Sequence, residues 1–365
     1  MTGIKYLEWI ISGLFGAAVV LGLSYATEKI HNKVLKIMIF AVKFILMIGL
    51  ALALIAFASP FLWKFNYPLS GIYIALLADC MCDIVMAVWM LFRKERSFKF
   101  RTAVFGVITA LVFIYGTVNS QVIRTDRMQV TSSKLNKQHT FVFLSDLHYG
   151  SSQRQDTVEK ALNEIRELHP EFVLLGGDIC DEHTLKEEME WTFEQLASLN
   201  TPVYYIYGNH DRQDRGSYIG GKKYTEEELA DTIQKNGITI LQDDQVQFDD
   251  DLFLLGREDS SRASRAAVKD LEPRPSDAFV ICTDHSPYQT EDILETSADL
   301  QLSGHTHAGQ YFPLKYVYAL LGLRVYDTYT VGNTLVYVSP GIGGWYMPFR
   351  NEARCSYAVI DLIPQ

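Results

Sequence analysis

The chain has 365 residues and a formal net charge of −10, from 43 acidic and 33 basic side chains. Up to residue 120 there are about 11 Lys or Arg and 5 Asp or Glu, and from residue 121 onward about 22 and 38. This acidic second part excludes the basic, phosphate-tracking surface of a general nucleic-acid binder, and it is long enough for one well-buried α/β domain.

Four apolar runs fill the first part of the chain. Each approaches or exceeds the length that a helix needs to cross a bilayer. Four such runs in series, with short polar connectors, disfavour the alternative of buried helices in a soluble protein. The first run is followed too closely by the second to be a simple cleaved signal. We therefore predict a four-span transmembrane region over residues 1–120. The runs are Tyr6–Ala26, Val34–Ala58, Leu69–Phe92 and Thr102–Val118.

Two carboxylates, Asp79 and Asp83, lie one helical turn apart inside the third run. A carboxylate facing lipid is costly, so both should face other helices or water. A structural polar contact inside the bundle is the favoured interpretation, and a proton or ion path is the alternative.

Basic connectors predict the orientation of the spans. The segment Arg93–Arg101 between the third and fourth runs is strongly basic, and Lys29 and Lys33 lie on the same side. Basic loops stay in the cytoplasm. We therefore expect a multi-pass membrane protein whose termini and soluble domain lie outside the cytoplasm.

Residues 121–365 alternate strands with helical stretches, and polar motifs follow the carboxyl ends of strands. Open α/β sheets build their sites on that edge. Further strands complete two packed sheets flanked by helices. The expected strands are Phe141–Ser145, Phe172–Leu175, Val203–Tyr207, Ile238–Leu241, Leu252–Leu255, Phe279–Cys282, Leu300–Leu302, Leu335–Val338 and Ala358–Leu362. The expected helices are Asp156–Leu168, Leu185–Leu199 and Glu226–Asn236.

Five short motifs concentrate acids, histidines and one amide, and they hold five of the nine histidines. Carboxylate, imidazole and amide groups are ligands for divalent metals, and two metals can share one carboxylate. Each motif alone could be an ordinary turn or a capped loop. Their order, strand-end placement and spacing are what make the set specific. The motifs are Asp146-Leu147-His148, Gly177-Asp178, Asn209-His210-Asp211, Asp284-His285 and Gly304-His305-Thr306-His307.

With this motif order, residues 141–362 resemble the calcineurin-like metallophosphoesterase superfamily. The resemblance implies a two-sheet β-sandwich flanked by helices over residues 121–365. Gly304–Gln310, Pro313 and Ser339–Gly343 further resemble the membrane-associated bacterial branch, which includes enzymes that cleave a UDP-linked diacylglucosamine pyrophosphate. That branch implies a bacterial cell membrane and a lipid-linked substrate.

The resemblance also implies roles for individual residues. His210 would be the catalytic histidine that stabilises or protonates the leaving oxygen, and Asp211 would orient it. Two divalent ions are implied, with Mn²⁺, Zn²⁺ and Fe all suited to the ligand set. The first metal is assigned to Asp146, His148 and His307, the second to Asn209, His285 and His305, and Asp178 bridges them.

The leading interpretation is a membrane-tethered phosphoester hydrolase. A metal-bridging hydroxide would attack a phosphodiester, a phosphomonoester or a lipid-linked pyrophosphate. One alternative is a membrane sensor or scaffold with a vestigial metal site, although the complete ligand set argues against it. Another is a transporter-like protein that uses Asp79 and Asp83, for which four spans are few. The sequence does not indicate an oligomeric state.

Three features depart from the family pattern or leave alternatives. Asp284 stands where an apolar residue commonly precedes the histidine, and it would add a charge beside the second metal. Arg350 lacks the Pro-Glu pair that follows it in many relatives, so a phosphate contact stays open. The apolar segment Tyr311–Leu323 is either a helix packed on the domain or a membrane-dipping wall that receives a lipid substrate.

Overall fold

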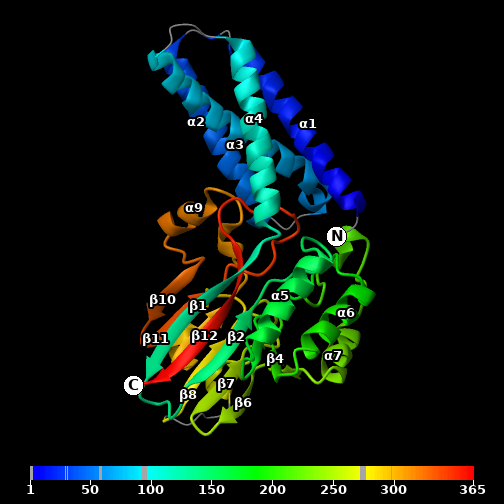
Figure 1. Cartoon of the computed structure of the whole chain (residues 1–365), viewed down its shortest axis with the longest axis vertical. Helices are drawn as coiled ribbons and strands as arrows, with labels where there is room; N and C mark the ends of the chain where they lie inside the picture. Colours follow the sequence, from blue (N-terminus) through cyan, green and yellow to red (C-terminus); the bar gives the residue numbers. More distant parts are fainter. Residues whose placement is uncertain are drawn as a thin grey trace. The chain divides into compact units, whose positions relative to one another are not determined.

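The computed structural model of the chain describes residues 3–28, 30, 32–56, 60–92, 97–271, 277–296 and 298–365. They form two compact units (Figure 1). The helical unit comprises residues 1–119 together with residues 311–314, and the α/β unit comprises residues 120–310 and 315–365.

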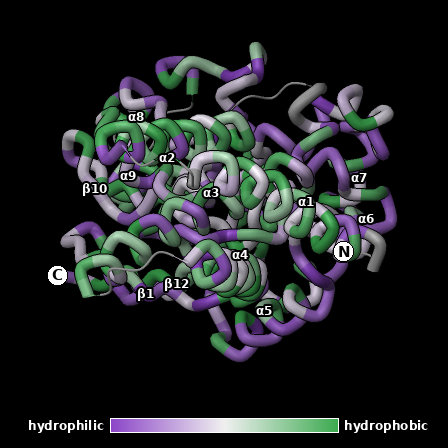
Figure 2. The backbone as a smooth tube through the Cα atoms, turned by 90° about the horizontal axis from the view of Figure 1, so that it is seen from above, coloured by the Kyte–Doolittle hydropathy of each residue, from purple (hydrophilic) through white to green (hydrophobic). Residues whose placement is uncertain are grey.

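Four long helices make up most of the helical unit. Each contains a stretch that is long and apolar enough to cross a membrane. Their tubes are mostly green and white in Figure 2, which is the hydrophobic half of the scale. The predicted bundle of four apolar helices is confirmed. The helices are α1 (Gly3–Glu28), α2 (Lys33–Ala56), α3 (Pro60–Phe92) and α4 (Phe98–Asn119).

Glycines allow α1 and α3 to approach closely. A Cβ atom on Gly16 would overlap the backbone of Gly71, and a Cβ atom on Gly71 would overlap the carbonyl of Ser12. Small residues at helix interfaces are common in membrane bundles. In lipid the hydrophobic effect does little to bring helices together, so close packing must stabilise their association. The two helices are therefore held by backbone contact.

An ion-pair cluster connects three helices of the helical unit. Lys43 of α2 lies 2.6 Å from Asp79 and 2.8 Å from Asp83 of α3. Arg101 of α4 lies 2.6 Å and 2.8 Å from the same two carboxylates. Ser24 of α1 donates a hydrogen bond to Asp79. The predicted structural contact of these carboxylates inside the bundle is confirmed.

Residues 311–314 pack within the helical unit. The hydroxyl of Tyr73 donates to the carbonyl of Phe312 at 2.7 Å, and the rings of Tyr73 and Tyr311 meet edge to face. The segment is therefore anchored to α3.

Part of the basic connector lies outside the described residues, namely residues 93–96, and so does Lys29. Lys33 begins α2, and Lys99 and Arg101 lie in the first turn of α4. The sidedness of the bundle stays a prediction from sequence.

Two six-stranded sheets form the α/β unit, with the orders β1-β12-β2-β3-β4-β5 and β10-β11-β9-β8-β7-β6. Neighbouring strands β2, β3 and β4 are parallel, as are β7, β8 and β9. The predicted two-sheet fold flanked by helices is confirmed. The strands are β1 Ile123–Ser132, β2 His139–Leu144, β3 Val173–Leu175, β4 Val203–Tyr205, β5 Thr239–Ile240, β6 Asp244–Asp249, β7 Leu252–Gly256, β8 Phe279–Thr283, β9 Leu300–Ser303, β10 Asp327–Val331, β11 Thr334–Val338 and β12 Cys355–Pro364. The helices are α5 Gln155–Glu167, α6 Lys186–Ala197, α7 Glu226–Lys235, α8 Thr290–Thr296 and α9 Leu314–Leu320, with short 3-10 turns at Gly216–Ile219, Val268–Asp270 and His307–Gly309.

Successive side chains of β2 pack into two different hydrophobic cores. Phe141 and Phe143 belong to the core that joins the two sheets. Val142 and Leu144 belong to the core under the helices, with Val158 of α5. This alternation is the two-residue period of a strand that is buried on both faces. It fixes β2 rigidly, and the site begins directly after it.

Three strands missing from the sequence expectation, β1, β6 and β10, all lie at sheet edges. Their side chains alternate between intermediate and exposed positions instead of being buried. Edge strands are commonly polar, so they lack a strong hydrophobic pattern. The short helix α8 was also not expected.

Candidate metal centre

The predicted ligands follow strand ends in both sheets. Asp146 comes after β2, Asp178 after β3 and Asn209 after β4, while His285 comes after β8 and His305 after β9. Because each of these strands is parallel to a neighbour, their carboxyl ends gather on one side of their sheet. Loops from both sheets therefore contribute to the site.

Five of the seven predicted ligands adopt a left-handed backbone conformation. This region is unfavourable for residues other than glycine, at about 1–3 kcal/mol each, and it clusters at functional sites. The fixed strands on either side hold the loops in these conformations. The φ angles are 55° for Asp146, 46° for His148, 52° for Asp178, 71° for His305 and 47° for His307.

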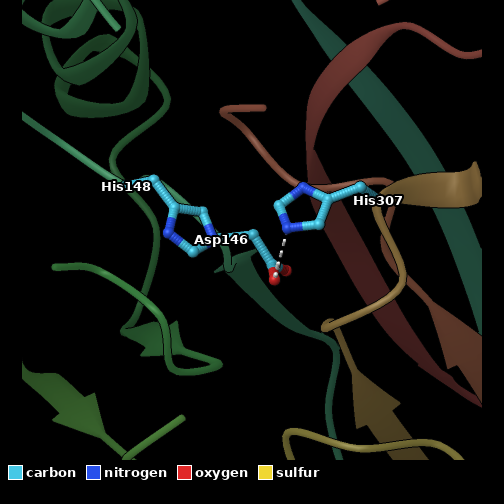
Figure 3. Close-up of side chains that lie close together, drawn as sticks. All are labelled: Asp146, His148 and His307. Atoms are coloured by element: carbon cyan, nitrogen blue, oxygen red, sulfur yellow. Dashed lines mark ion pairs between the residues drawn. The ribbon is translucent and has the colours of Figure 1, made fainter. Parts of the chain in front are cut away.

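Asp146, His148 and His307 form one cluster of potential ligands. Each offers an atom that lies within 4.8 Å of the others, and all three are buried. Nε2 of His307 lies 3.7 Å from Oδ1 of Asp146. In Figure 3 the carboxylate of Asp146 points toward the ring of His307, which comes from a different loop than Asp146 and His148. A single cation can contact all three groups.

Asp178, His285 and His305 form a second cluster by the same criterion. Nε2 of His285 lies 3.1 Å from Oδ2 of Asp178. The side-chain oxygen of Asn209 lies 2.8 Å from Nδ1 of His305, which places the amide at this cluster. Oδ2 of Asp178 is also 3.7 Å from Nε2 of His148, so this carboxylate lies between the two clusters.

Unpartnered buried nitrogens indicate that the clusters suit metal ions. Among the described residues, both ring nitrogens of His148 and Nε2 of His285 have no hydrogen-bond partner. Nδ1 of His148 lies 3.4 Å from Oδ2 of Asp181 without hydrogen-bond geometry. Nδ1 of His285 instead meets the carbonyl of Gly176 at 2.8 Å, the usual way to aim the other nitrogen at a metal. A buried nitrogen left unpaired costs about 1–3 kcal/mol, so this donor set fits divalent cations.

Comparison with known proteins identifies the domain. The family model for the calcineurin-like phosphoesterase matches residues 139–309, a span that contains all seven predicted ligands. Residues 139–309 form a calcineurin-like phosphoesterase domain.

Relatives with similar names occur in bacteria and animals. An "Uncharacterized metallophosphoesterase" of Helicobacter pylori is 31% identical over 243 residues, which are 64% of this chain and 62% of that protein. A "Transmembrane protein with metallophosphoesterase domain" of Danio rerio is 28% identical over 291 residues, 73% of this chain and 64% of that protein. The chain thus spans less than two thirds of the length of these relatives. A solved dimetal phosphatase from Danio rerio aligns over 56% of this chain and 87% of its own, with a TM-score of 0.35 and 11% identity.

Burial and charge set the protonation of several ligands in the phosphoesterase domain. Burial and the charge of His285 lower the pKa of His305 to about 4. Burial and the charge of His148 lower the pKa of His307 well below its usual range. Burial alone would raise the pKa of Asp178, but the charges of His285 and His210 lower it well below the usual range. Two neutral imidazoles and an ionised carboxylate are what metal binding requires.

Against the effect of burial, Asp181 and Asp178 raise the pKa of His148. His285 also differs from His305 and His307. Burial opposes its charge, but the attraction of Asp178 raises the pKa of His285 well above the usual value. An imidazolium cannot be a ligand, so metal binding at His285 requires the loss of this proton.

The expected orienting role of Asp211 needs correction. Its carboxylate accepts backbone N–H groups of Asp178 at 2.7 Å, Gly208 at 2.7 Å and Cys180 at 2.9 Å, not a proton of the His210 ring. The group that meets Nδ1 of His210 is the buried carboxylate of Glu182, at 2.8 and 3.0 Å. Asp211 therefore ties the loops after β3 and β4 together, and Glu182 orients the histidine.

The charge that Asp284 was expected to add beside the second metal has an ion-pair partner in the structure. Asp284 is buried and lies 2.6 Å from Nη2 of Arg265, which lies 2.8 Å from Asp292 as well. The charge of Asp284 is therefore paired with that of Arg265.

Arg350 holds a loop in place. Its side chain is fully buried, and it donates to the carbonyls of His307 and Pro340 at 2.7 Å and of Gly343 at 2.8 Å. The phosphate contact that the sequence left open is disfavoured, because both terminal nitrogens bind backbone oxygens. Arg350 instead fixes the backbone at His307.

One site residue, Glu182, was not expected from the sequence. Glu182 follows Asp178 by four residues, and the acidic pair Asp181-Glu182 was the available signal. Gly208 and Gly304 are required by shape, since a Cβ atom on Gly208 would overlap the carboxylate of Asp178. A Cβ atom on Gly304 would likewise overlap the carboxylate of Asp146. These two glycines therefore let the loops pass close to the predicted ligands.

Proposed function

We propose that the protein is a membrane-tethered hydrolase of phosphoester bonds that uses two divalent metals. The observation that carries this proposal is that Asp178, which forms one cluster with His285 and His305, also lies 3.7 Å from His148 of the other cluster, formed by Asp146, His148 and His307. A two-metal centre with a shared carboxylate needs this arrangement.

Different residues of the chain would have different roles in hydrolysis. Divalent ions held by the two clusters would neutralise charge on the phosphate oxygens and increase the acidity of water. Asp146 is held by the backbone N–H of His305 at 2.9 Å, and Asp178 by that of His210 at 2.8 Å, so both carboxylates are fixed before substrate arrives. Fixed ligands position the phosphate for attack by water.

His210 supplies the proton for the leaving oxygen. Burial opposes its charge, but Glu182 and Asp178 raise the pKa of His210 to about 9. The ring is therefore protonated at neutral pH, and Nδ1 is engaged by Glu182. Nε2 then carries the proton that can pass to a departing alkoxide.

Exposed apolar side chains support a lipid-linked phosphate or pyrophosphate as the substrate. α9 begins seven residues after His307. Leu320 and Leu321, at the end of α9, are 88% and 68% exposed, although Leu314 is buried. Residues 311–314, at the start of this segment, belong to the helical unit. This favours the membrane-dipping interpretation of the segment over a helix that is fully packed on the domain.

The location follows from the same reasoning. Four apolar helices support a membrane location, and we propose a bacterial cell membrane with the α/β unit outside the cytoplasm.

Hydrolysis by the purified full-length protein tests the proposal. With Mn²⁺ it should cleave bis-p-nitrophenyl phosphate or p-nitrophenyl phosphate, and metal analysis should find two ions per chain. Asp178→Asn should abolish activity, whereas the matched change Asp231→Asn, on an exposed site of α7, should leave it intact. A folded protein that stays inert and metal-free after reconstitution would favour the sensor or scaffold alternative.

The substrate class has its own test. Replacing Leu320 and Leu321 by Ser should reduce cleavage of a lipid pyrophosphate in vesicles and leave cleavage of the soluble esters unchanged. Equal activity of this variant and the wild type on both substrates would contradict the lipid part of the proposal.

A further inference from the structure

A carboxylate from outside the predicted ligand set lies behind one of the ligand histidines. Oδ2 of Asp181 is 3.4 Å from Nδ1 of His148, whose Nε2 lies 3.7 Å from the bridging carboxylate of Asp178. One ring nitrogen of His148 therefore faces the metal centre and the other faces Asp181. Nδ1 has no hydrogen-bond partner among the described residues, so no other group competes with Asp181 for it.

Asp181 is held firmly in this place. Its side chain is buried, and Oδ1 accepts the backbone N–H of His183 at 2.8 Å. Oδ2 accepts the hydroxyl of Ser151, which also donates to the carbonyl of His148 at 3.1 Å. One serine thus connects the carboxylate with the residue that it faces. Both oxygens accept hydrogen bonds, which is the pattern of an ionised carboxylate.

The backbone brings Asp181 to this position. The loops after β2 and β3 run side by side, because the N–H of His148 donates to the carbonyl of Asp178 at 3.1 Å. The N–H of Tyr149 likewise donates to the carbonyl of Ile179 at 3.3 Å. Two residues further along, Asp181 reaches the ring of His148 from its own loop. The contact follows from the order of the strands, so it does not need a metal to form.

The other predicted ligand histidines have neutral oxygens behind them. Among the described residues, Asp181 is the one carboxylate outside the ligand set that lies within ion-pair distance of a ring nitrogen of these histidines. The neutral contacts are Nδ1 of His285 with the carbonyl of Gly176 at 2.8 Å, Nδ1 of His305 with the side-chain oxygen of Asn209 at 2.8 Å, and Nδ1 of His307 with the carbonyl of Gly343 at 3.4 Å.

Two further acids lie near the second predicted site, and neither takes the position that Asp181 takes at the first. Asp284 precedes His285 and is paired with Arg265 at 2.6 Å. Asp259 is buried and accepts the N–H of Ser261 at 3.0 Å. Its charge acts on His285 from beyond ion-pair distance. Neither acid is therefore a partner of a ring nitrogen at the second site.

The two predicted sites consequently differ in negative charge. The first site has its own carboxylate, Asp146, and it has Asp181 behind a ligand. The second site has the neutral amide of Asn209 and only the shared carboxylate of Asp178. A carboxylate behind a ligating imidazole fixes its tautomer and increases its basicity, and added negative charge attracts a dication. The first site should therefore hold a divalent ion more strongly.

We propose that Asp181 is a positioning residue that makes the first metal site the tighter of the two, so that the first site fills before the second. With its Nδ1–H directed at Asp181, His148 keeps the lone pair of Nε2 for the metal. The second ion would then be the one that exchanges readily with the surroundings. This inference rests on the proposed two-metal function, because it assigns different affinities to the two sites of that centre.

Titration of the full-length protein with Mn²⁺, after removal of metal by a chelator, tests the proposal without any measurement of hydrolysis. Isothermal titration calorimetry should show one tight and one weaker binding step in the wild type. Asp181→Asn should reduce the affinity of the tight step roughly 10- to 100-fold, the loss that is typical for groups behind metal ligands, and leave the weaker step unchanged. Asp231→Asn, on an exposed site of α7, removes the same charge and should titrate like the wild type.

Two more variants connect the binding steps with the sites. Asn209→Ala should remove the weaker step and leave the tight step near its wild-type affinity. Ser151→Ala removes one hydrogen bond to Asp181, so it should weaken the tight step by roughly 3- to 10-fold. Because this second change is small, it provides the measurement even if Asp181→Asn does not fold.

Each possible result separates this inference from the proposed function. Equal affinities for the two ions in the wild type, or a tight step that Asp181→Asn and Ser151→Ala leave unchanged, would overturn the inference while the two-metal function stands. Loss of the tight step in Asn209→Ala would also overturn it, since the tighter ion would then occupy the second site. A folded wild type that binds no Mn²⁺ would contradict the proposed function, and this inference with it.

Discussion

Replacing Glu182 by Gln should move the alkaline limb of the pH–activity profile. Glu182 is buried and meets Nδ1 of His210 at 2.8 Å, and its charge helps to raise the pKa of that ring to about 9. A hydrogen bond to a charged group contributes about 1.5–3 kcal/mol, and 1.36 kcal/mol equals one pH unit. Glu182→Gln should therefore lower the pKa of His210 by about one to two pH units.

The direction of the change in activity follows from the role of His210 as an acid. His210 is active when protonated, so activity is present below its pKa and is lost as pH rises through it. In Glu182→Gln the loss should begin at lower pH: kcat at pH 7 should fall by no more than about twofold, and kcat at pH 9 should fall roughly 5- to 50-fold. The assay is kcat against pH on p-nitrophenyl esters. Glu187→Gln, an exposed change on α6, is the matched control. A folded Glu182→Gln protein with an unmoved alkaline limb would refute the reasoning.

Three other changes separate structural from chemical roles. Gly208→Ala should expel the Asp178 carboxylate from its place and lower metal content, as measured by mass spectrometry of the metal. Arg350→Ala should leave several buried carbonyls without donors, at about 1–3 kcal/mol each, and lower the melting temperature. Asp211→Asn should lower the melting temperature while leaving the alkaline limb of the pH profile in place, because Asp211 binds backbone N–H groups and not the ring of His210. A shifted limb in Asp211→Asn would restore its expected orienting role.

Local patterns in the sequence were sufficient to predict the metal-binding motifs and most of the buried strands. Asp146, Asp178 and His285 each follow a buried strand, and both a hydrophobic run and its polar end can be read without knowing what packs on them. The edge strand β1 could not be recognised in this way. It carries Arg124 and Asp126 at exposed or half-exposed positions, and its partner β12 lies more than 200 residues away in the chain.

The partner of His210 depended on loop geometry, which local sequence does not specify. Asp211 was the expected partner because it is adjacent to His210 in the sequence. Successive residues of a turn point in different directions, however, and the carboxylate of Asp211 binds the loop after β3. Glu182 reaches His210 because the loops after β3 and β4 lie side by side, as their parallel strands dictate. A contact across neighbouring strands can be inferred only once their order in the sheet is known.

The same cross-loop contacts explain how strained ligand conformations persist. Asp146 accepts the N–H of His305, which lies 159 residues further along, and Asp178 accepts that of His210. Each acidic ligand therefore fixes the loop that carries another site residue. Left-handed conformations at Asp146 and Asp178 cost free energy locally, and the bonds between loops together with the packed strands offset that cost. Because these hydrogen bonds do not involve a metal, the loops should keep their arrangement when metal is removed. Metal binding should therefore require the loss of a proton from His285 and little refolding of the site.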